Sequence, residues 1–236
     1  YASDGTTQIG TFYAQNRIVV PLKKISKPMR QAVVSREDRR FFRHAGVDIQ
    51  GVMRAFVATY VKKGATQGGS SLTQQYVKNV LLLQAQEDND PIAEYHASEE
   101  TVARKLREML IAVQMEKTYS KLEILQGYLN IAQFGRGIYG VEMAARRYFS
   151  TTAAKLDIVQ TATIAAITKN PAAFDPSVES NQKASQRERN IVLDLMYQEK
   201  YISQKQRDEA KAKPLKDTLK LQDAQAGCSA SGDAAF

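Results

Sequence analysis

Two adjacent carboxylates, Glu37 and Asp38, are the strongest candidates for acid–base chemistry in the sequence. They end a segment of helical periodicity that begins after Ser26, and neighbours on a helix point about 100° apart, so they cannot face each other as a catalytic pair. Glu37 continues the apolar stripe of this segment and Asp38 does not. Because partial desolvation suits a carboxylate to act as a general base, Glu37 is the better candidate; the alternative is an ordinary solvated or ion-paired glutamate.

Glu108 is a second candidate catalytic residue, within a cationic stretch of another predicted helix. Arg104 precedes it by one turn, Lys105 borders the same face, and Leu106 and Val113 lie on the opposite face. The simpler interpretation is an exposed helical ion pair, which contributes little because arginine before glutamate is the weaker order. Spacing alone favours that simpler interpretation.

A third group of polar side chains follows a glycine-rich turn. After residues 68–69, which are both glycine, Ser70 or Ser71 can cap a helix. Two neighbouring stripes of this helix carry amide and amine groups: Gln74 with Lys78, and Gln75 with Asn79. The free N–H groups and positive dipole end of the helix, together with the charge of Lys78, could hold a phosphate, although the spacing is not that of a phosphate-binding loop.

Histidine and cysteine are too rare here to build a metal site of their own. The chain has two histidines and one cysteine, Cys228, which excludes an internal disulfide framework. His44 follows two phenylalanines close to the end of the first helix. A histidine in such a place more often bonds a nearby carboxylate for structural reasons than takes part in catalysis.

The remaining pattern predicts a mainly α fold with a small β-hairpin near the N-terminus, within residues 1–21. Helices are expected at 26–37, 48–63, from 70 onward, 98–117, from 120 onward, 140–149, 153–168, 182–201 and 203–212. The acidic segment 86–100, interrupted by Pro91, is expected to be a mobile connection. The helix at 98–117 is expected to turn an apolar stripe inward: Val102, Leu106, Met109, Leu110 and Val113.

Length and charge limit the organisation and the partners of the chain. Its 236 residues suit one domain, 1–213, followed by a small, polar, linker-like tail, 214–236. A net charge of +8 favours anionic partners, which include nucleic acid, an acidic membrane surface and a phosphorylated substrate. No stretch reaches the roughly 20 apolar residues of a membrane-spanning helix, and the chain starts at Tyr1, so we expect an excised piece.

Five motifs, in order over about residues 20–201, resemble the transglycosylase domain of class A penicillin-binding proteins, glycosyltransferase family 51. They are Glu37-Asp38 with Phe41, His44, Gly46 and Asp48; Gly69 to Gln75 with Lys78-Asn79; Arg104 to Glu108; Lys121, Ile124-Leu125 and Tyr128-Leu129-Asn130 through Phe134-Gly135 and Tyr139-Gly140; and Lys169-Asn170-Pro171 with Pro176. Ser71 replaces the usual threonine of the second motif, and Gln160 stands where many members carry glutamate.

The resemblance implies a lysozyme-like, two-lobed helical fold and a peptidoglycan glycosyltransferase. Lipid II would be the acceptor and the growing lipid-linked glycan the donor. Glu37 would remove the proton of the acceptor's carbon-4 hydroxyl, and inverting attack would release undecaprenyl pyrophosphate. Lys78, Arg104 and Lys105 would stabilise the pyrophosphate, while Glu108 would orient them or help to hold a divalent cation, Mg²⁺ or Mn²⁺; no organic cofactor is expected. The expected substrate-binding residues are Asp38, His44, Ser71, Thr73, Gln74, Gln75, Lys78, Asn79, Arg104, Lys105 and Asn130.

The same resemblance also implies where in the cell the domain works and which partners it meets. The domain would work at the extracytoplasmic face of the bacterial cell membrane, with its anchor outside this chain, and would meet the cell-wall synthesis machinery and phosphoglycolipid inhibitors of the moenomycin type. The apolar segment 49–61, followed by Lys62 and Lys63, would suit the bilayer interface, and its alternative is a buried core helix. The tail either leads to an absent transpeptidase domain or ends a monofunctional relative.

Two other functions compete with this interpretation. A lytic enzyme with a lysozyme-like fold would use a helix-end glutamate as an acid that cleaves glycan, and it would not need cations around a pyrophosphate. A basic nucleic-acid-binding module would bind DNA with strong salt dependence, although we expect no nucleic acid.

Overall fold

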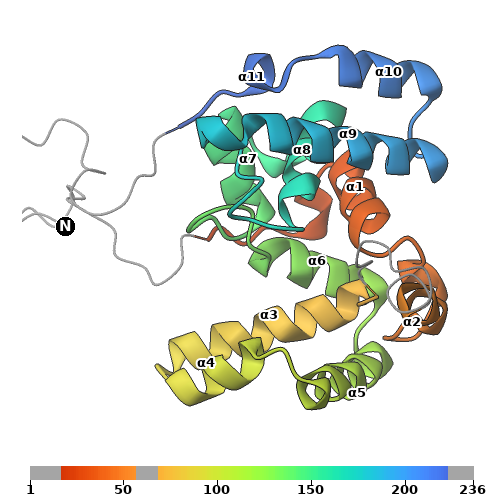
Figure 1. Ribbon diagram of the computed structural model, residues 1–236, viewed down its shortest axis with the longest axis vertical. Coiled ribbons are helices and arrows are strands. Elements are labelled where there is room, and N and C mark those ends of the chain that lie inside the picture. The colour runs from red at the N-terminus through yellow and green to blue at the C-terminus, as the bar shows by residue number, and fades with distance from the viewer. Residues whose placement is uncertain (1–16, 57–68, 223–236) are drawn as a thin grey trace, which may run out of the picture.

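The computed structural model describes residues 17–56 and 69–222, in which helices dominate (Figure 1). The α-helices in these ranges are α1 (Lys27–Glu37), α2 (Ile49–Phe56), α3 (Leu72–Glu87), α4 (Pro91–Ser98), α5 (Val102–Thr118), α6 (Lys121–Ile131), α7 (Val141–Phe149), α8 (Ile158–Ile167), α9 (Gln182–Gln198), α10 (Gln204–Ala212) and α11 (Leu215–Thr218). Short 3₁₀ turns lie at Leu22–Lys24, Phe41–Arg43, Ala153–Lys155 and Glu179–Asn181. The predicted mainly α fold is confirmed.

The predicted N-terminal hairpin is not confirmed. Its first part lies outside the described residues, and residues 17–21 form no regular structure. The described ranges contain no strand, and an isolated antiparallel bridge joins Gln133 to Tyr139.

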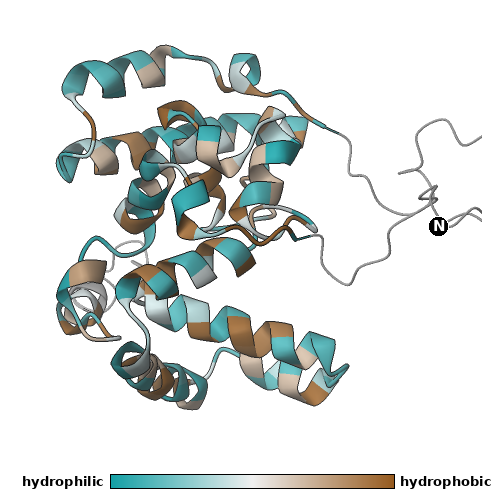
Figure 2. Ribbon diagram, turned by 180° about the vertical axis from the view of Figure 1, so that it is seen from behind, coloured by the Kyte–Doolittle hydropathy of each residue, from teal (hydrophilic) through white to brown (hydrophobic). Residues whose placement is uncertain are grey.

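The helices form two groups, with α6 between them (Figure 1). In one group α8 packs against α1, α7 and α9, and α10 and α11 lie on the outer side of α9. In the other group α3 packs against α4 and α5, and it also contacts α6. Nearly every residue of α8 is buried, because this helix is mostly apolar and its two threonine hydroxyls bond to its own backbone, whereas the outer helix α10 is largely hydrophilic (Figure 2).

The helix starts predicted near residues 26, 70, 120 and 203 are confirmed, and each has a serine cap. Ser26, Ser71, Ser120 and Ser203 each accept a hydrogen bond from a backbone N–H of the first helical turn. The helix expected at 153–168 is instead a 3₁₀ turn followed by α8, because Asp157 and Gln160 form a capping box that starts a new helix. This gives Gln160, whose uncharged side chain departs from many family members, a structural role.

The prediction of a mobile connection at 86–100 is wrong, since most of it is helical. Helix α3 continues to Glu87, and α4 then begins at Pro91. Asp90 caps α4 by accepting from the backbone N–H groups of Ile92 and Ala93, both at 3.0 Å. Proline is well suited to the first position of a helix because that position needs no N–H donor, so Pro91 starts a helix here instead of interrupting one.

The predicted inner face of α5 is also wrong. Val102, Leu106 and Leu110 are 78%, 54% and 73% exposed, while Glu108 and Ala112 are buried. The polar face can pack inward because the charge of Glu108 is compensated within the helix and because Ala112 is small. At Gly46, which has φ +84°, an added Cβ would come within 2.7 Å of the Ala112 backbone, so the chain passes very close to α5 there.

Two further segments bear on the predicted organisation. Ile49 and Met53 of α2 are 73% and 60% exposed, so the alternative of a fully buried core helix is wrong for the described part of segment 49–61. The described part of the predicted tail, 214–236, packs on the domain: Leu215 is buried, and the backbone N–H of Lys220 donates to the carbonyl of Tyr148 at 2.8 Å. None of the described helices combines the length and apolarity needed to cross a membrane.

Candidate active site

A cleft of about 1340 Å³ lies between the two groups of helices. Its walls come from the C-terminal ends of α1 and α8, the N-terminal halves of α3 and α5, and parts of α2, α6 and α9. Eight lysine or arginine residues line it against five aspartate or glutamate residues, so the cleft favours anionic ligands. Most of the polar residues singled out in the sequence meet here.

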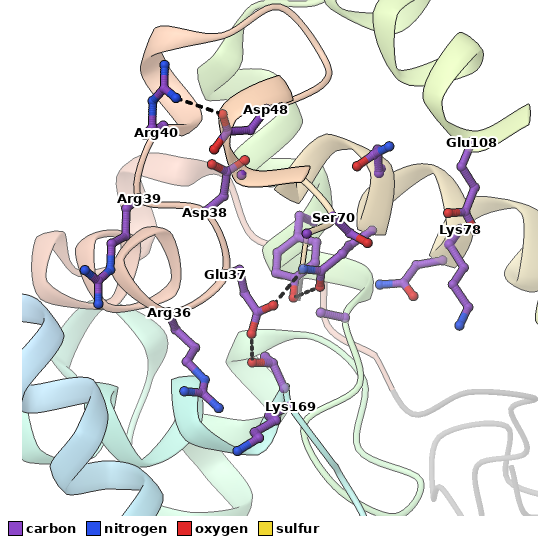
Figure 3. Close-up of a pocket in the computed structure, with 18 of the residues that line it drawn as sticks. Arg36, Glu37, Asp38, Arg39, Arg40, Asp48, Ser70, Lys78, Glu108 and Lys169 are labelled. Carbon is purple, nitrogen blue, oxygen red and sulfur yellow. Dashed lines mark hydrogen bonds and ion pairs between the residues drawn. The ribbon is translucent and has the colours of Figure 1, made fainter. Parts of the chain in front are cut away.

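Glu37 is the last residue of α1, and its carboxylate is held from two other helices. The amide of Gln75, on α3, donates to Oε2 at 2.7 Å, and the hydroxyl of Thr168, directly after α8, donates to Oε1. Figure 3 shows Glu37 with Lys78 and Glu108 on one side and Arg36, Arg39 and Lys169 on the other. A fixed carboxylate among cations is positioned to accept a proton from a bound hydroxyl group.

Tyr128 is linked to Glu37 by hydrogen bonds through the side-chain amide of Gln75. Its hydroxyl lies 3.3 Å from Oε1 of Gln75, where it donates a hydrogen bond. Burial, together with the negative charge of Glu37, raises the pKa of Tyr128 well above its usual value. The phenol therefore stays protonated and remains a donor over the whole neutral range.

Asp38 and His44 tie the loop after α1 to the start of α3. One oxygen of Asp38 accepts from the backbone N–H of Leu72 at 2.9 Å and lies 2.8 Å from Nε2 of His44. The two side chains are 2% and 6% exposed. Ser71 adds a second tie, because its hydroxyl donates to the carbonyl of Gly46. These bonds fix the loop that directly follows Glu37 relative to the α3 wall.

Glu108 anchors two cations on the opposite wall of the cleft. Its side chain is 2% exposed, and its oxygens accept from Arg104 and, at 2.9 Å, from Lys105. Lys105 also donates to the hydroxyl of Ser70 at 2.6 Å. The buried carboxylate thus holds both cationic side chains at the cleft surface.

The residues around Glu108 do not fit a divalent cation as they stand. Both of its oxygens already accept hydrogen bonds from cations. No group of three His, Cys, Asp or Glu side chains that could hold a metal ion occurs in the part of the chain that the structure describes. The Mg²⁺ or Mn²⁺ site therefore stays a prediction, and we derive no step through it.

Lys78 and its neighbours on α3 complete this wall. Lys78, Asn79, Gln74 and Gln75 all line the cleft. Within residues 17–56 and 69–222 the ammonium group of Lys78 has no ion-pair or hydrogen-bond partner. Gln74 is buried, its oxygen accepts from the backbone N–H of Ser71 at 2.7 Å, and its NH₂ group has no partner among the described residues.

Four predicted substrate-binding residues do not line the cleft: His44, Ser71, Thr73 and Asn130. Thr73 donates to Glu116 of α5, and the amide of Asn130 donates to the carbonyls of Val20 and Gln126 at 2.9 and 2.8 Å. Their side chains therefore bind other parts of the protein in this arrangement.

The sequence did not single out two residues that bear on the cleft: Thr168, which lines it, and Glu188, which does not line it but bonds two cations that do. Thr168 contacts Glu37 across 131 positions of the chain, and nothing in its local pattern indicates this. Glu188 on α9 bridges Arg36 and Lys169, at 2.9 Å each, and these two cations line the cleft. The only available signal was that Lys169 stands in the fifth motif.

Comparison with known proteins defines the class of the chain. The sequence model of the family described as Transglycosylase matches residues 5–197. The chain therefore belongs to the transglycosylase family, in agreement with the resemblance to the transglycosylase domain of class A penicillin-binding proteins.

Individual relatives agree with this assignment. The chain is 38% identical over 206 residues to penicillin-binding protein 1A of Aquifex aeolicus, covering 87% of the chain and 26% of that protein. It is 37% identical over 215 residues to penicillin-binding protein 1A of Haemophilus influenzae, covering 91% and 23%. The crystal structure of the Haemophilus influenzae protein matches with a TM-score of 0.49 and 21% identity, over 92% of this chain and 20% of that one. The chain thus spans about a quarter of the length of these curated relatives.

Proposed function

We propose that this chain is a peptidoglycan glycosyltransferase that polymerises lipid II into glycan strands, with Glu37 as its catalytic base. The observation that carries the proposal is the place of Glu37 in a member of the transglycosylase family: its carboxylate is fixed in the wall of a cleft where lysine and arginine outnumber aspartate and glutamate. A lysozyme-like arrangement of two lobes around this cleft would present donor and acceptor to the same carboxylate.

In this mechanism Glu37 accepts the proton of the carbon-4 hydroxyl of the acceptor. The acceptor O–H bond breaks as an O–H bond forms on Glu37, and the acceptor oxygen attacks the anomeric carbon of the donor from the face opposite its leaving group. The bond between that carbon and the pyrophosphate oxygen breaks, and its electron pair leaves with undecaprenyl pyrophosphate. A base positioned in this way contributes on the order of 10² to 10⁴ in rate.

The cations of the α3 and α5 wall would stabilise the departing pyrophosphate. Glu108 holds Arg104 and Lys105 in position before substrate arrives, so little reorganisation is needed as charge develops. Lys78 supplies a further charge that no described group neutralises. Gln74, Gln75 and Asn79 line the same wall, where their amide groups could bind the substrate head group.

We assign the predicted site residues that do not line the cleft to a supporting role. Asp38, which does line it, shares this role because one oxygen of its carboxylate already bonds His44 and the backbone of Leu72. Through Ser71 and Thr73 the start of α3 is tied to the loop after α1 and to α5. These residues would keep the base and the cationic wall at a constant separation.

A membrane surface is the proposed location of the domain, at the extracytoplasmic face of the cell membrane. Apolar residues are exposed on α2 and on α5, including Ile49, Met53, Leu106 and Leu110. Exposed apolar stripes next to a cationic cleft would let the domain take substrates from the bilayer interface. Phosphoglycolipid inhibitors of the moenomycin type and the cell-wall synthesis machinery are the further partners that we propose.

Polymerisation of purified lipid II tests the proposal. The protein should convert lipid II into glycan polymer, and Glu37→Gln should fold normally yet lose at least roughly a hundredfold of this activity. Glu87→Gln, at the exposed last residue of α3, is the matched control and should keep it. Near-normal polymerisation by Glu37→Gln would place the base elsewhere.

The same assay distinguishes a polymerase from a lytic enzyme that cleaves glycan. Shortening of preformed glycan without formation of polymer would identify a hydrolase and overturn the proposal.

A further inference from the structure

The hydroxyl group of Thr168 lies between Glu37 and a main-chain carbonyl. Its Oγ is within hydrogen-bond distance of Oε1 of Glu37 and lies 2.8 Å from the carbonyl oxygen of Ala165. A threonine hydroxyl has one proton to donate and two lone pairs that accept. It can therefore donate to the carboxylate or to the carbonyl, but not to both at once.

The other oxygen of Glu37 faces a group that can only donate. The NH₂ group of Gln75 lies 2.7 Å from Oε2, and the carbonyl end of the same amide accepts from Tyr128. Because burial keeps Tyr128 protonated, this phenol continues to donate and fixes the orientation of the amide. Gln75 thus suits an oxygen that carries no proton, in either state of Glu37.

We propose that Thr168 is a positioning residue that hydrogen-bonds the base both before and after proton transfer. Before transfer, the hydroxyl donates to Oε1 of the ionised carboxylate. After transfer, the neutral carboxyl group carries its proton on Oε1 and donates it to Oγ of Thr168, whose own proton turns to the carbonyl of Ala165. The pair gains one proton, the one that Glu37 takes from the acceptor hydroxyl; Thr168 keeps its own proton, and its hydroxyl only rotates. The inference rests on the proposed role of Glu37 as the base.

A third helix holds the two partners together. Glu188 on α9 accepts from Lys169, which follows Thr168, and from Arg36, which precedes Glu37, both at 2.9 Å. The side chain of Glu188 is 12% exposed, and Figure 3 shows Arg36 and Lys169 on the same side of Glu37. The end of α1 and the end of α8 are therefore clamped to one carboxylate, which keeps the Thr168 hydroxyl at Oε1.

Removal of the hydroxyl leaves the charged and titratable surroundings of Glu37 unchanged. Arg36 on its own helix, Tyr128 on α6 and Lys169 after α8 are among these groups, with Glu188 on α9 behind the two cations. The cleft adds Asp38 and Arg39 after α1, Lys78 on α3 and Glu108 on α5. A change in the pH dependence of a Thr168 variant can then be assigned to the lost hydrogen bond.

Steady-state polymerisation of lipid II by Thr168→Val and Thr168→Ser tests the inference. Valine keeps the shape of threonine without its hydroxyl, so kcat should fall by roughly tenfold with KM within about twofold of the unaltered protein. The bond that the hydroxyl donates to the ionised carboxylate is stronger than the bond it accepts from the neutral carboxyl group, so its loss should move the acidic limb of the pH–rate profile to higher pH. Serine keeps the hydroxyl, so Thr168→Ser should have the kcat of the unaltered protein and the same position of the acidic limb.

Thr161→Val is the matched control. Thr161 lies on α8 as well, and its hydroxyl donates to the carbonyl of Ile158, three residues earlier, at 3.0 Å, as Thr168 does to Ala165. Its loss should leave kcat and the pH profile unchanged. Thr168→Ala, which also lacks the hydroxyl, provides the same measurement if the valine variant does not fold.

Two results would overturn the inference. One is a hydroxyl-free variant with the kcat and acidic limb of the unaltered protein, and the other is a serine variant as impaired as the valine variant. Glu37→Gln is measured beside them. If it polymerises normally, the proposed function of Glu37 fails and the inference fails with it; if it is inactive while Thr168→Val is unimpaired, the inference alone fails.

Discussion

Replacing Glu108 with glutamine tests the cationic wall of the cleft. The two oxygens of Glu108 accept from Arg104 and Lys105, and the side chain is 2% exposed. Glutamine keeps the shape and one acceptor oxygen, but it loses the negative charge and turns an NH₂ group toward one of the cations. Arg104 and Lys105 then remain at the cleft without their anionic partner.

The expected loss of stability follows from the exposure of the two cations. The side chain of Lys105 is 36% exposed, so solvent screens its ion pair, whereas that of Arg104 is 13% exposed. The Arg104 pair therefore dominates, and a hydrogen bond between buried charged groups leads us to expect a loss of about 2 to 3 kcal/mol. For a domain of this size the melting temperature should fall by roughly 4 to 12 °C.

Glu142→Gln is the control that separates stability from function. Glu142 on α7 is also buried and accepts from an arginine one turn away, Arg146 at 2.8 Å, but it does not line the cleft. Glu142→Gln should also lose stability in thermal unfolding, but less than Glu108→Gln, because the Arg146 side chain is 49% exposed and solvent screens its ion pair. At a temperature well below both transitions, Glu108→Gln should lose at least roughly a hundredfold of its polymerisation rate and Glu142→Gln should keep most of its rate.

Two outcomes would refute this reasoning. An equal loss of activity in both variants would mean that general destabilisation, not the cleft, explains the effect. Near-normal activity of a folded Glu108→Gln would remove the held cation pair from the mechanism.

Three further predictions concern other parts of the molecule. Lys78→Ala should weaken binding of a moenomycin-type phosphoglycolipid by roughly tenfold in a calorimetric titration, and unchanged affinity would remove Lys78 from the pyrophosphate site. Burial raises the pKa of Tyr128 and of Tyr148, so both stay protonated in the folded state while the unfolded chain ionises. The stabilisation of the folded state by each protonated tyrosine is complete below about pH 10. Above that pH it falls by about 1.4 kcal/mol per pH unit for each tyrosine. The free energy of unfolding, measured in denaturant titrations, should therefore fall less with pH in Tyr148→Phe. Replacing Leu106 and Leu110 together by glutamine should weaken binding to anionic lipid vesicles in sedimentation, while thermal stability stays within about 1 kcal/mol because both side chains are exposed.

Local signals predicted helix starts well and predicted the orientation of α5 badly. A serine cap acts through the backbone of its own helix, so Ser26 and Ser71 could be identified without knowledge of the fold. The face that a helix buries depends on its neighbours. On α5 the inward face is that of Glu108, since Arg104 and Lys105 compensate its charge, and the apolar stripe is left outside.

The candidate site was also predicted only in part. The motifs placed Glu37, Gln75 and Glu108 in one site, and the cleft brings them together. The partner of Glu37 on its other oxygen, Thr168, could not be predicted, because that contact exists only once α1 and α8 are packed. Spacing likewise gave no sign that Asn130 binds the N-terminal segment at Val20.

The hydrogen bonds around Glu37 also link the proposed catalytic base to the cooperativity of folding. They join the end of α1 to α3 and to the end of α8, and the clamp by Glu188 adds α9. Because these segments are far apart in sequence, closing them into one site requires most of the chain to be ordered. A partly folded intermediate that keeps only local helices has no assembled base. Activity should therefore disappear in the same denaturant range as the global unfolding transition, and isolated fragments of the chain should be inactive even where their helices persist.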